Sequence, residues 1–262
     1  MTSTAGEEGA SSEIQAVTRV GQIFSLFGAQ CTELTATEVA ERLGLNRTTA
    51  YRYCASLAAV GFLERGSRRG SFMLGGLMLE LGILAIGRRR VVELAPSYLG
   101  RLSSATRTTA VMSLWGATGP VVTRVEEDMQ RTVVVTVRVG ARLDHRTAQA
   151  KVFLAWHPDR YTVERMIGDL DPVERAELEL ELDQVRETGI SIVSETDGLV
   201  GAAAPVFDEY GICATVALLG TDRMTDFTPD SDAMRLLIDV ADALTSEVRG
   251  STPPHAAASV PA

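Results

Sequence analysis

The sequence has few of the residues that build metal centres and disulfide frameworks. Its 262 residues include three cysteines and three histidines, and neither set has the spacing of metal ligands. Three scattered cysteines also exclude a disulfide framework. Lysine is nearly missing, since Lys151 stands alone against 24 arginines, a bias that indicates GC-rich coding. The scattered residues are Cys31, Cys54, Cys213, His145, His157 and His255.

Long hydrophobic runs and common catalytic motifs are lacking as well. The most apolar stretch, 73–87, has 15 residues, fewer than the roughly 18 to 20 that span a bilayer. The N-terminus does not follow the pattern of a secretory signal, so we expect a cytoplasmic protein with no membrane partner. No Gly-x-Ser-x-Gly, Gly-x-Gly-x-x-Gly or phosphate-loop motif occurs. We therefore expect neither an enzyme nor a bound cofactor or metal.

Charge is distributed unevenly along the chain. The net charge is −9, which by itself disfavours a nucleic-acid partner. Residues 13–75 and 76–101 nevertheless each carry a net charge of +2, and residues 102–262 carry −11. A basic N-terminal third joined to an acidic remainder predicts two parts with different partners.

The basic third has the pattern of a winged helix-turn-helix domain. Apolar residues recur at helical spacing over 15–28. The segment 35–38 is a capping box that opens a short helix ending at Gly44. Asn46 can cap a third helix running to about Val60. Two short alternating segments, 62–65 and 71–74, flank the basic turn 66–70 and predict a β-hairpin.

This pattern points to DNA, because a short helix holding a second helix at an angle lets that helix enter the major groove. Threonine and arginine there reach base edges, and an arginine-bearing wing reaches phosphate or the minor groove. A small helical bundle with a solvated arginine face is the alternative. The candidate DNA-contacting residues are Arg47, Thr48, Thr49, Tyr51, Arg52, Arg68 and Arg69.

The remainder predicts an α+β domain built on a largely antiparallel sheet. The predicted strands are 110–115, 121–126, 133–139, 190–193, 199–207 and 212–219, and the helices are 148–156, 172–187 and 230–249. The predicted organisation is a disordered tail over 1–12, the winged domain over 13–75, a linker helix over 76–96, the second domain over 97–250 and a disordered tail over 251–262. The linker begins with an apolar helix over 76–86, which is expected to pack against the body or a second subunit.

Four motifs follow one another between Ala16 and Arg249. They are the segment 45–52, Leu-Asn-Arg-Thr-Thr-Ala-Tyr-Arg, then Phe72-Met73-Leu74-Gly75, and then the segments 145–155 and 203–211. In this order they resemble the signatures of the IclR-type bacterial transcriptional regulators. The first is similar to the family's recognition helix, the second to the return of the wing into the linker, and the other two to further family signatures.

The resemblance implies a GAF-like effector domain, and dimers or dimers of dimers on a palindromic operator in double-stranded DNA. It implies that the backbone N–H groups of Ala148 and Gln149 meet a small-molecule effector and that Ser191, Gly201, Ala217 and Leu219 line the remaining wall. Relatives that hold small keto acids have an acid, a cysteine and two hydroxyls at these four positions. This wall is less polar, which favours a larger, apolar or aromatic effector. Trp115 is either a stacking wall for that effector or part of the core.

The expected function is a ligand-responsive, DNA-binding transcriptional regulator of a catabolic or efflux operon. Two alternatives stay open. One is a small-molecule sensor that acts through a protein partner and uses its N-terminal domain for dimerisation. The other is an architectural DNA-binding protein whose body binds no ligand.

Overall fold

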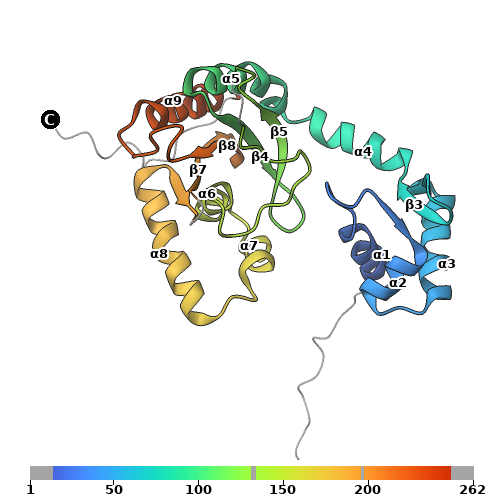
Figure 1. The fold of residues 1–262 in the computed structure, drawn as a ribbon. Helices are drawn as coiled ribbons and strands as arrows, with labels where there is room; N and C mark the ends of the chain where they lie inside the picture. The colour runs from blue at the N-terminus through green and yellow to red at the C-terminus, as the bar shows by residue number, and fades with distance from the viewer. Residues whose placement is uncertain (1–13, 131–133, 196–197, 249–262) are drawn as a thin grey trace, which may run out of the picture. The chain divides into compact units, whose positions relative to one another are not determined.

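The computed structural model describes residues 14–130, 134–195 and 198–248. The chain divides into two compact units, residues 1–85 and 86–262 (Figure 1). The predicted tails, 1–12 and 251–262, lie outside the described residues.

The first unit is a helical domain with a small antiparallel sheet. Its sheet has the strand order β1-β3-β2, and its core gathers Ile23 of the first helix, Ala50 of the third and Phe72 of the hairpin, each fully buried. The elements are α1 (Gln15–Ser25), β1 (Glu33–Thr35), α2 (Ala36–Leu43), α3 (Arg47–Ala59), β2 (Leu63–Arg65), β3 (Ser71–Leu74) and α4 (Gly76–Gly87).

The signals that begin and end helices act as the sequence predicts. The Thr35 side chain accepts from the backbone N–H of Glu38, and the Glu38 side chain accepts from the N–H of Thr35, which completes the capping box. Gly44 ends α2 in the left-handed conformation, with φ +63°, which glycine adopts without steric cost. Asn46 Oδ1 accepts from the N–H of Thr48 at 2.8 Å and begins α3. Strand β1 was not predicted, because three residues are too few to show alternation.

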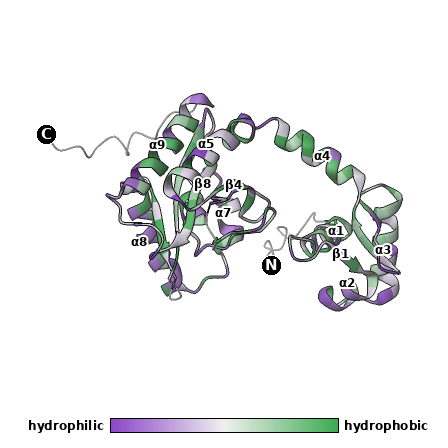
Figure 2. Ribbon diagram, turned by 45° about the horizontal axis from the view of Figure 1, so that its top comes forward, coloured by the Kyte–Doolittle hydropathy of each residue, from purple (hydrophilic) through white to green (hydrophobic). Residues whose placement is uncertain are grey.

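The linker differs from the single helix predicted over 76–96. Helix α4 ends at Gly87, and α5 begins at Arg90. No residue of α4 is buried, and Figure 2 shows most of α4 in the colour of hydrophobic residues. Val91 and Ala95 of α5, by contrast, are buried in the core of the second unit. The second half of the predicted linker is therefore part of that core.

The second unit is a five-stranded antiparallel sheet between two layers of helices (Figure 1). The strand order is β5-β4-β8-β7-β6. Helices α5 and α9 pack on one face and α6 and α8 on the other, so the predicted α+β class is confirmed. The elements are α5 (Arg90–Thr106), β4 (Thr109–Trp115), β5 (Pro120–Glu126), α6 (Ala148–Trp156), α7 (Arg160–Ile167), α8 (Pro172–Thr188), β6 (Ser191–Ser194), β7 (Leu199–Asp208), β8 (Gly211–Thr221) and α9 (Asp232–Glu247).

One predicted strand is wrong. Of the segment 133–139, residues 134–139 are described, and they form no strand. Strand β4 is already paired on both edges, by β5 and β8. The outer edge of β5 is bonded by the residues that follow, since Gly140 N–H donates to Val122 O at 2.8 Å and Leu143 N–H to Pro120 O at 2.9 Å. Alternation alone does not make a strand, and here residues 140–143 bond to the edge of β5 in place of the predicted segment. Helix α7 was not predicted.

Candidate nucleic-acid interface and effector site

The first turns of α3 carry an exposed polar surface. The Asn46 cap fixes where the helix starts, and the apolar face of Ala50, Cys54 and Leu57 is buried. The opposite side is therefore held outward. All five candidate residues of this helix are exposed: Arg47, Thr48, Thr49, Tyr51 and Arg52. The structure thus brings these sequence-predicted residues together at one end of one helix.

The structure adds Arg65, which the sequence analysis did not single out. Its guanidinium lies over the ring of Phe72 at 4.6 Å and over the ring of Tyr51 at 5.9 Å. Its Nη2 also donates to the Tyr51 hydroxyl at 3.5 Å. Arg65 therefore joins the exposed side of α3 to the hairpin through cation–π contacts.

The two arginines at the tip of the hairpin differ in their surroundings. We call β2, the turn 66–70 and β3 the wing. Arg69 is exposed, whereas the Arg68 guanidinium forms ion pairs with Glu38 at 3.3 Å and Glu33 at 3.8 Å. Half of the Arg68 side chain remains exposed. Its hydrogen bond to the Glu38 carboxylate, and the charge of that group, raise the pKa of Arg68 above its ordinary value.

In the second unit, the predicted effector wall is a compact patch on the sheet face that α6 covers. Ser191 pairs with Ala203, which pairs with Ala217. Gly201 pairs with Leu219 one row away, and a Cβ on Gly201 would lie 3.9 Å from the Cβ of Ala148. The structure therefore brings Ala148, Gly201, Ala217, Leu219 and Ser191 together. Leu219 and Gly201 are half-buried, and the other three are buried.

Gln149 and Trp115 lie farther along the same face. The buried Gln149 side chain donates to Thr215 Oγ1 at 3.2 Å. Trp115 stands six residues beyond Thr109, the partner of Leu219 in β4, which is about 20 Å along a strand. Its ring packs against Phe153, with centroids 5.5 Å apart. Val111, the partner of Ala217 in β4, is only four residues from Trp115, about 13 Å. Trp115 is half-buried against the core of this face, and its two predicted roles, stacking wall and core residue, both stay predictions.

A hollow of about 620 Å³ borders this patch at the sheet edge formed by β6. Ser191 is the one residue of the predicted wall that also lines the hollow. Lys151 lies there too, with its Nζ 2.8 Å from the Glu181 carboxylate and only 12% of its side chain exposed. The hollow is large enough for a small molecule.

Three further observations concern metal ligands, helix length and cysteine chemistry. Across residues 14–130, 134–195 and 198–248, no group of three or more His, Cys, Asp or Glu side chains is placed to hold a metal. None of the described helices has the length and apolar character that crossing a bilayer requires. Desolvation raises the pKa of the Cys213 thiol to about 12, so this thiol is protonated at neutral pH and is a poor nucleophile.

Comparison with known proteins identifies both units. Residues 16–67 match the IclR helix-turn-helix domain, and residues 83–245 match the bacterial transcriptional regulator IclR C-terminal domain. The HTH-type transcriptional regulator XynR of Escherichia coli (strain K12) is 28% identical over 230 residues, which cover 84% of this chain and 90% of XynR.

Two solved structures share the fold. An IclR transcriptional regulator from Silicibacter sp. TM1040 has a TM-score of 0.80 at 21% identity, covering 92% of this chain and 98% of that one. An IclR homolog from Microbacterium hydrocarbonoxydans, complexed with 4-hydroxybenzoate, has a TM-score of 0.69 at 20% identity, covering 89% and 98%. With both of its units matched in order, the chain belongs to the IclR family of DNA-binding bacterial transcriptional regulators.

Proposed function

We propose that this regulator controls a catabolic or efflux operon from the cytoplasm, binds a palindromic operator as a homodimer or dimer of dimers, and responds to an apolar or aromatic metabolite. The observation that carries the DNA-binding part is the exposed first turns of α3 beside a basic wing in one compact unit. Thr48, Thr49 and Arg52 read base edges in the major groove. Arg47 and Arg69 contact phosphates or the minor groove.

Helix α4 is proposed as the contact between two copies of the chain. Leu79, Ile83 and Ile86 follow one another at helical spacing and are 67%, 62% and 44% exposed. Single apolar side chains on a surface are ordinary, but a contiguous apolar stripe marks an interface. Packing two copies of α4 together covers the stripe. The two recognition helices are then related by a twofold axis, as are the two half-sites of a palindrome.

The effector is proposed to bind at the patch of Ala148, Ser191, Gly201, Ala217 and Leu219. Its walls are aliphatic, which suits an aromatic ring. The N–H groups of the first turn of α6 and the Ser191 hydroxyl suit a carboxylate, because the first N–H groups of a helix have no intrahelical partner and favour anions. The 4-hydroxybenzoate in the Microbacterium homolog supports this class of ligand. Binding alters operator affinity by shifting the paired winged domains through the 76–96 connector.

Selection of genomic fragments by the full chain, followed by a salt titration of the best one, tests the DNA-binding role. An enriched palindrome whose affinity falls steeply with salt is the expected result. Arg52→Ala weakens binding to that palindrome by roughly 5- to 150-fold, the usual value of a base contact. Lack of enrichment, with or without cell extract, contradicts the proposal and favours a sensor that acts through a protein partner.

Thermal shift and calorimetry with 4-hydroxybenzoate, benzoate and pyruvate test the effector class. An aromatic acid at about 100 times its dissociation constant stabilises the chain by roughly 2.7 kcal/mol, and pyruvate gives a smaller effect. Ser191→Ala lowers the affinity for the aromatic acid by about fivefold, which corresponds to the loss of one hydrogen bond. Ser104→Ala is the control, since Ser104 is exposed on α5, a helix that packs on the opposite face of the sheet. Preference for pyruvate refutes the assignment.

A further inference from the structure

The carboxylate of Glu33 accepts several hydrogen bonds from the turn of the wing. Glu33 lies on β1, yet it accepts hydrogen bonds from three groups some 34 to 38 residues away. The backbone N–H of Arg68 donates to Oε1 at 2.7 Å, the Ser67 hydroxyl donates to Oε2 at 3.0 Å, and the Ser71 hydroxyl donates to Oε1. Both oxygens of one carboxylate are therefore used to fix the shape of this turn.

The side chain of Arg68 ties the turn to α2 as well. Its Nη2 donates to the carbonyl oxygen of Glu33 at 2.9 Å, and its two terminal nitrogens each lie 3.3 Å from an oxygen of Glu38. Glu38 is itself held by the capping box with Thr35. The guanidinium is thus directed toward its own domain, and the helix that precedes the recognition helix becomes rigidly joined to the wing.

The wing turn packs tightly against Glu33, and the carboxylates of Glu33 and Glu38 keep their charge at neutral pH. A Cβ added to Gly66 would lie 2.1 Å from Glu33 Oε1, so the turn passes directly over the carboxylate. The Ser71 hydrogen bond, foremost, lowers the pKa of Glu33, and the Thr35 N–H, foremost, lowers the pKa of Glu38 to about 2. Both groups are ionised at neutral pH.

We propose that Glu33 and Glu38 are positioning residues for DNA recognition, and that Arg68 is the tie through which they hold the wing and not a phosphate contact. The proposal rests on the DNA-binding function proposed above. It gives two acidic groups in a DNA-binding domain a favourable role. It also leaves Arg69 as the basic side chain that the wing turn presents to DNA.

The inference is tested by whether removal of an acidic charge strengthens or weakens DNA binding. If electrostatics alone mattered, removal of an acid near DNA would strengthen binding. Anchoring predicts the opposite: Glu33→Gln and Glu38→Gln each weaken binding to the genomic fragment enriched by the wild-type chain, by roughly tenfold, the change expected from losing a hydrogen bond to a charged group. Glutamine at position 38 still serves the capping box, so the helix is preserved.

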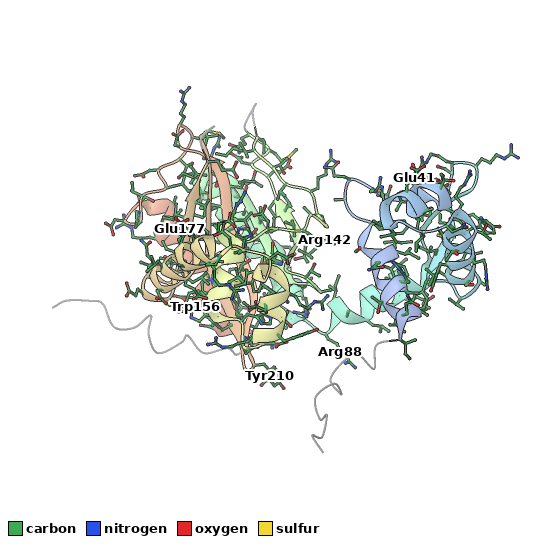
Figure 3. The ribbon with its side chains drawn as sticks, turned by 90° about the horizontal axis from the view of Figure 1, so that it is seen from below. Glu41, Arg88, Arg142, Trp156, Glu177 and Tyr210 are labelled. Atoms are coloured by element: carbon green, nitrogen blue, oxygen red, sulfur yellow. The ribbon has the colours of Figure 1, made fainter. Side chains whose placement is uncertain are left out.

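Glu41→Gln is the matched control, because Glu41 lies exposed on the same helix and points away from the body of its unit (Figure 3). It leaves affinity unchanged or slightly stronger. Arg68→Ala weakens binding by the same factor as Glu38→Gln, and the double variant is no weaker than either single one, as expected for partners in one interaction. Tighter binding by Glu38→Gln, or additive losses, overturns the proposal.

Amide hydrogen exchange of the full chain separates this inference from the proposed function. In Glu33→Gln the N–H of Arg68 exchanges at least tenfold faster, and the N–H groups of α3 keep their wild-type rates. That result supports anchoring even if the wild-type chain enriches no fragment, in which case only the DNA-binding role fails. Unchanged exchange at Arg68 overturns the anchoring itself, and a circular-dichroism melt confirms that each variant is folded.

Discussion

Substitution of Leu79 by serine tests whether α4 joins two copies of the chain. Full burial of a leucine stabilises by roughly 1.5–3 kcal/mol. Leu79 is 67% exposed in the single chain, so covering it in a dimer contributes about 1–2 kcal/mol. A twofold axis makes the contact occur twice. Leu79→Ser is therefore expected to weaken the dimer by about 2–4 kcal/mol, which raises its dissociation constant roughly 30- to 900-fold.

Sedimentation equilibrium over nanomolar to micromolar protein measures this constant directly. Leu180→Ser is the matched control: Leu180 is 72% exposed, lies inside helix α8, and suffers the same loss of helix propensity. The control is expected to self-associate as the wild-type chain does. Equal association of Leu79→Ser and wild type, or equal weakening by both variants, would refute the assignment of the interface to α4.

Three further predictions concern the first unit. Asn46→Ala removes the cap of α3 and should destabilise this unit by about 1 kcal/mol in urea unfolding; a loss no larger than that of Glu41→Ala, at an exposed, non-capping position of α2, would contradict it. Gly75→Ala places a Cβ 2.3 Å from the carbonyl oxygen of Gly61 and should cost about 1–3 kcal/mol, whereas Gly21→Ala, with open space around it, should not destabilise. Since the folded-state pKa of Glu38 is about 2, below its ordinary 4.5, its contribution is complete above pH 4.5 and is lost as the pH falls toward 2. Glu38→Gln should flatten that part of the stability profile, and an unchanged profile would count against a stabilising role of the ionised carboxylate, which accepts from the Thr35 N–H and from Arg68.

The local features of this protein can be predicted from the sequence. A capping box, a left-handed glycine and an asparagine cap determine where α2 and α3 begin and end, because each depends on atoms within four residues. Alternating residues predicted β4, β5, β7 and β8 to within two residues at each end. The exposed candidates on α3 follow from the same local periodicity. The recognition helix could therefore be identified without a structure.

Features that depend on residues far apart in the sequence could not be identified from the sequence alone. Strand β1 exists because β3 pairs with it, and residues 134–139 form no strand, while residues 140–143 bond to the edge of β5. The ion pairs of Arg68 with Glu33 and Glu38 also depend on the tertiary structure, because these acids lie about 30 to 35 residues earlier in the sequence. Trp115 shares a sheet face with the effector patch and lies about 13 Å along the strand from the level of Ala217 and about 20 Å from that of Leu219. The sequence specifies which side chains are polar, and the tertiary structure decides which of them meet each other and which are left for DNA or a ligand.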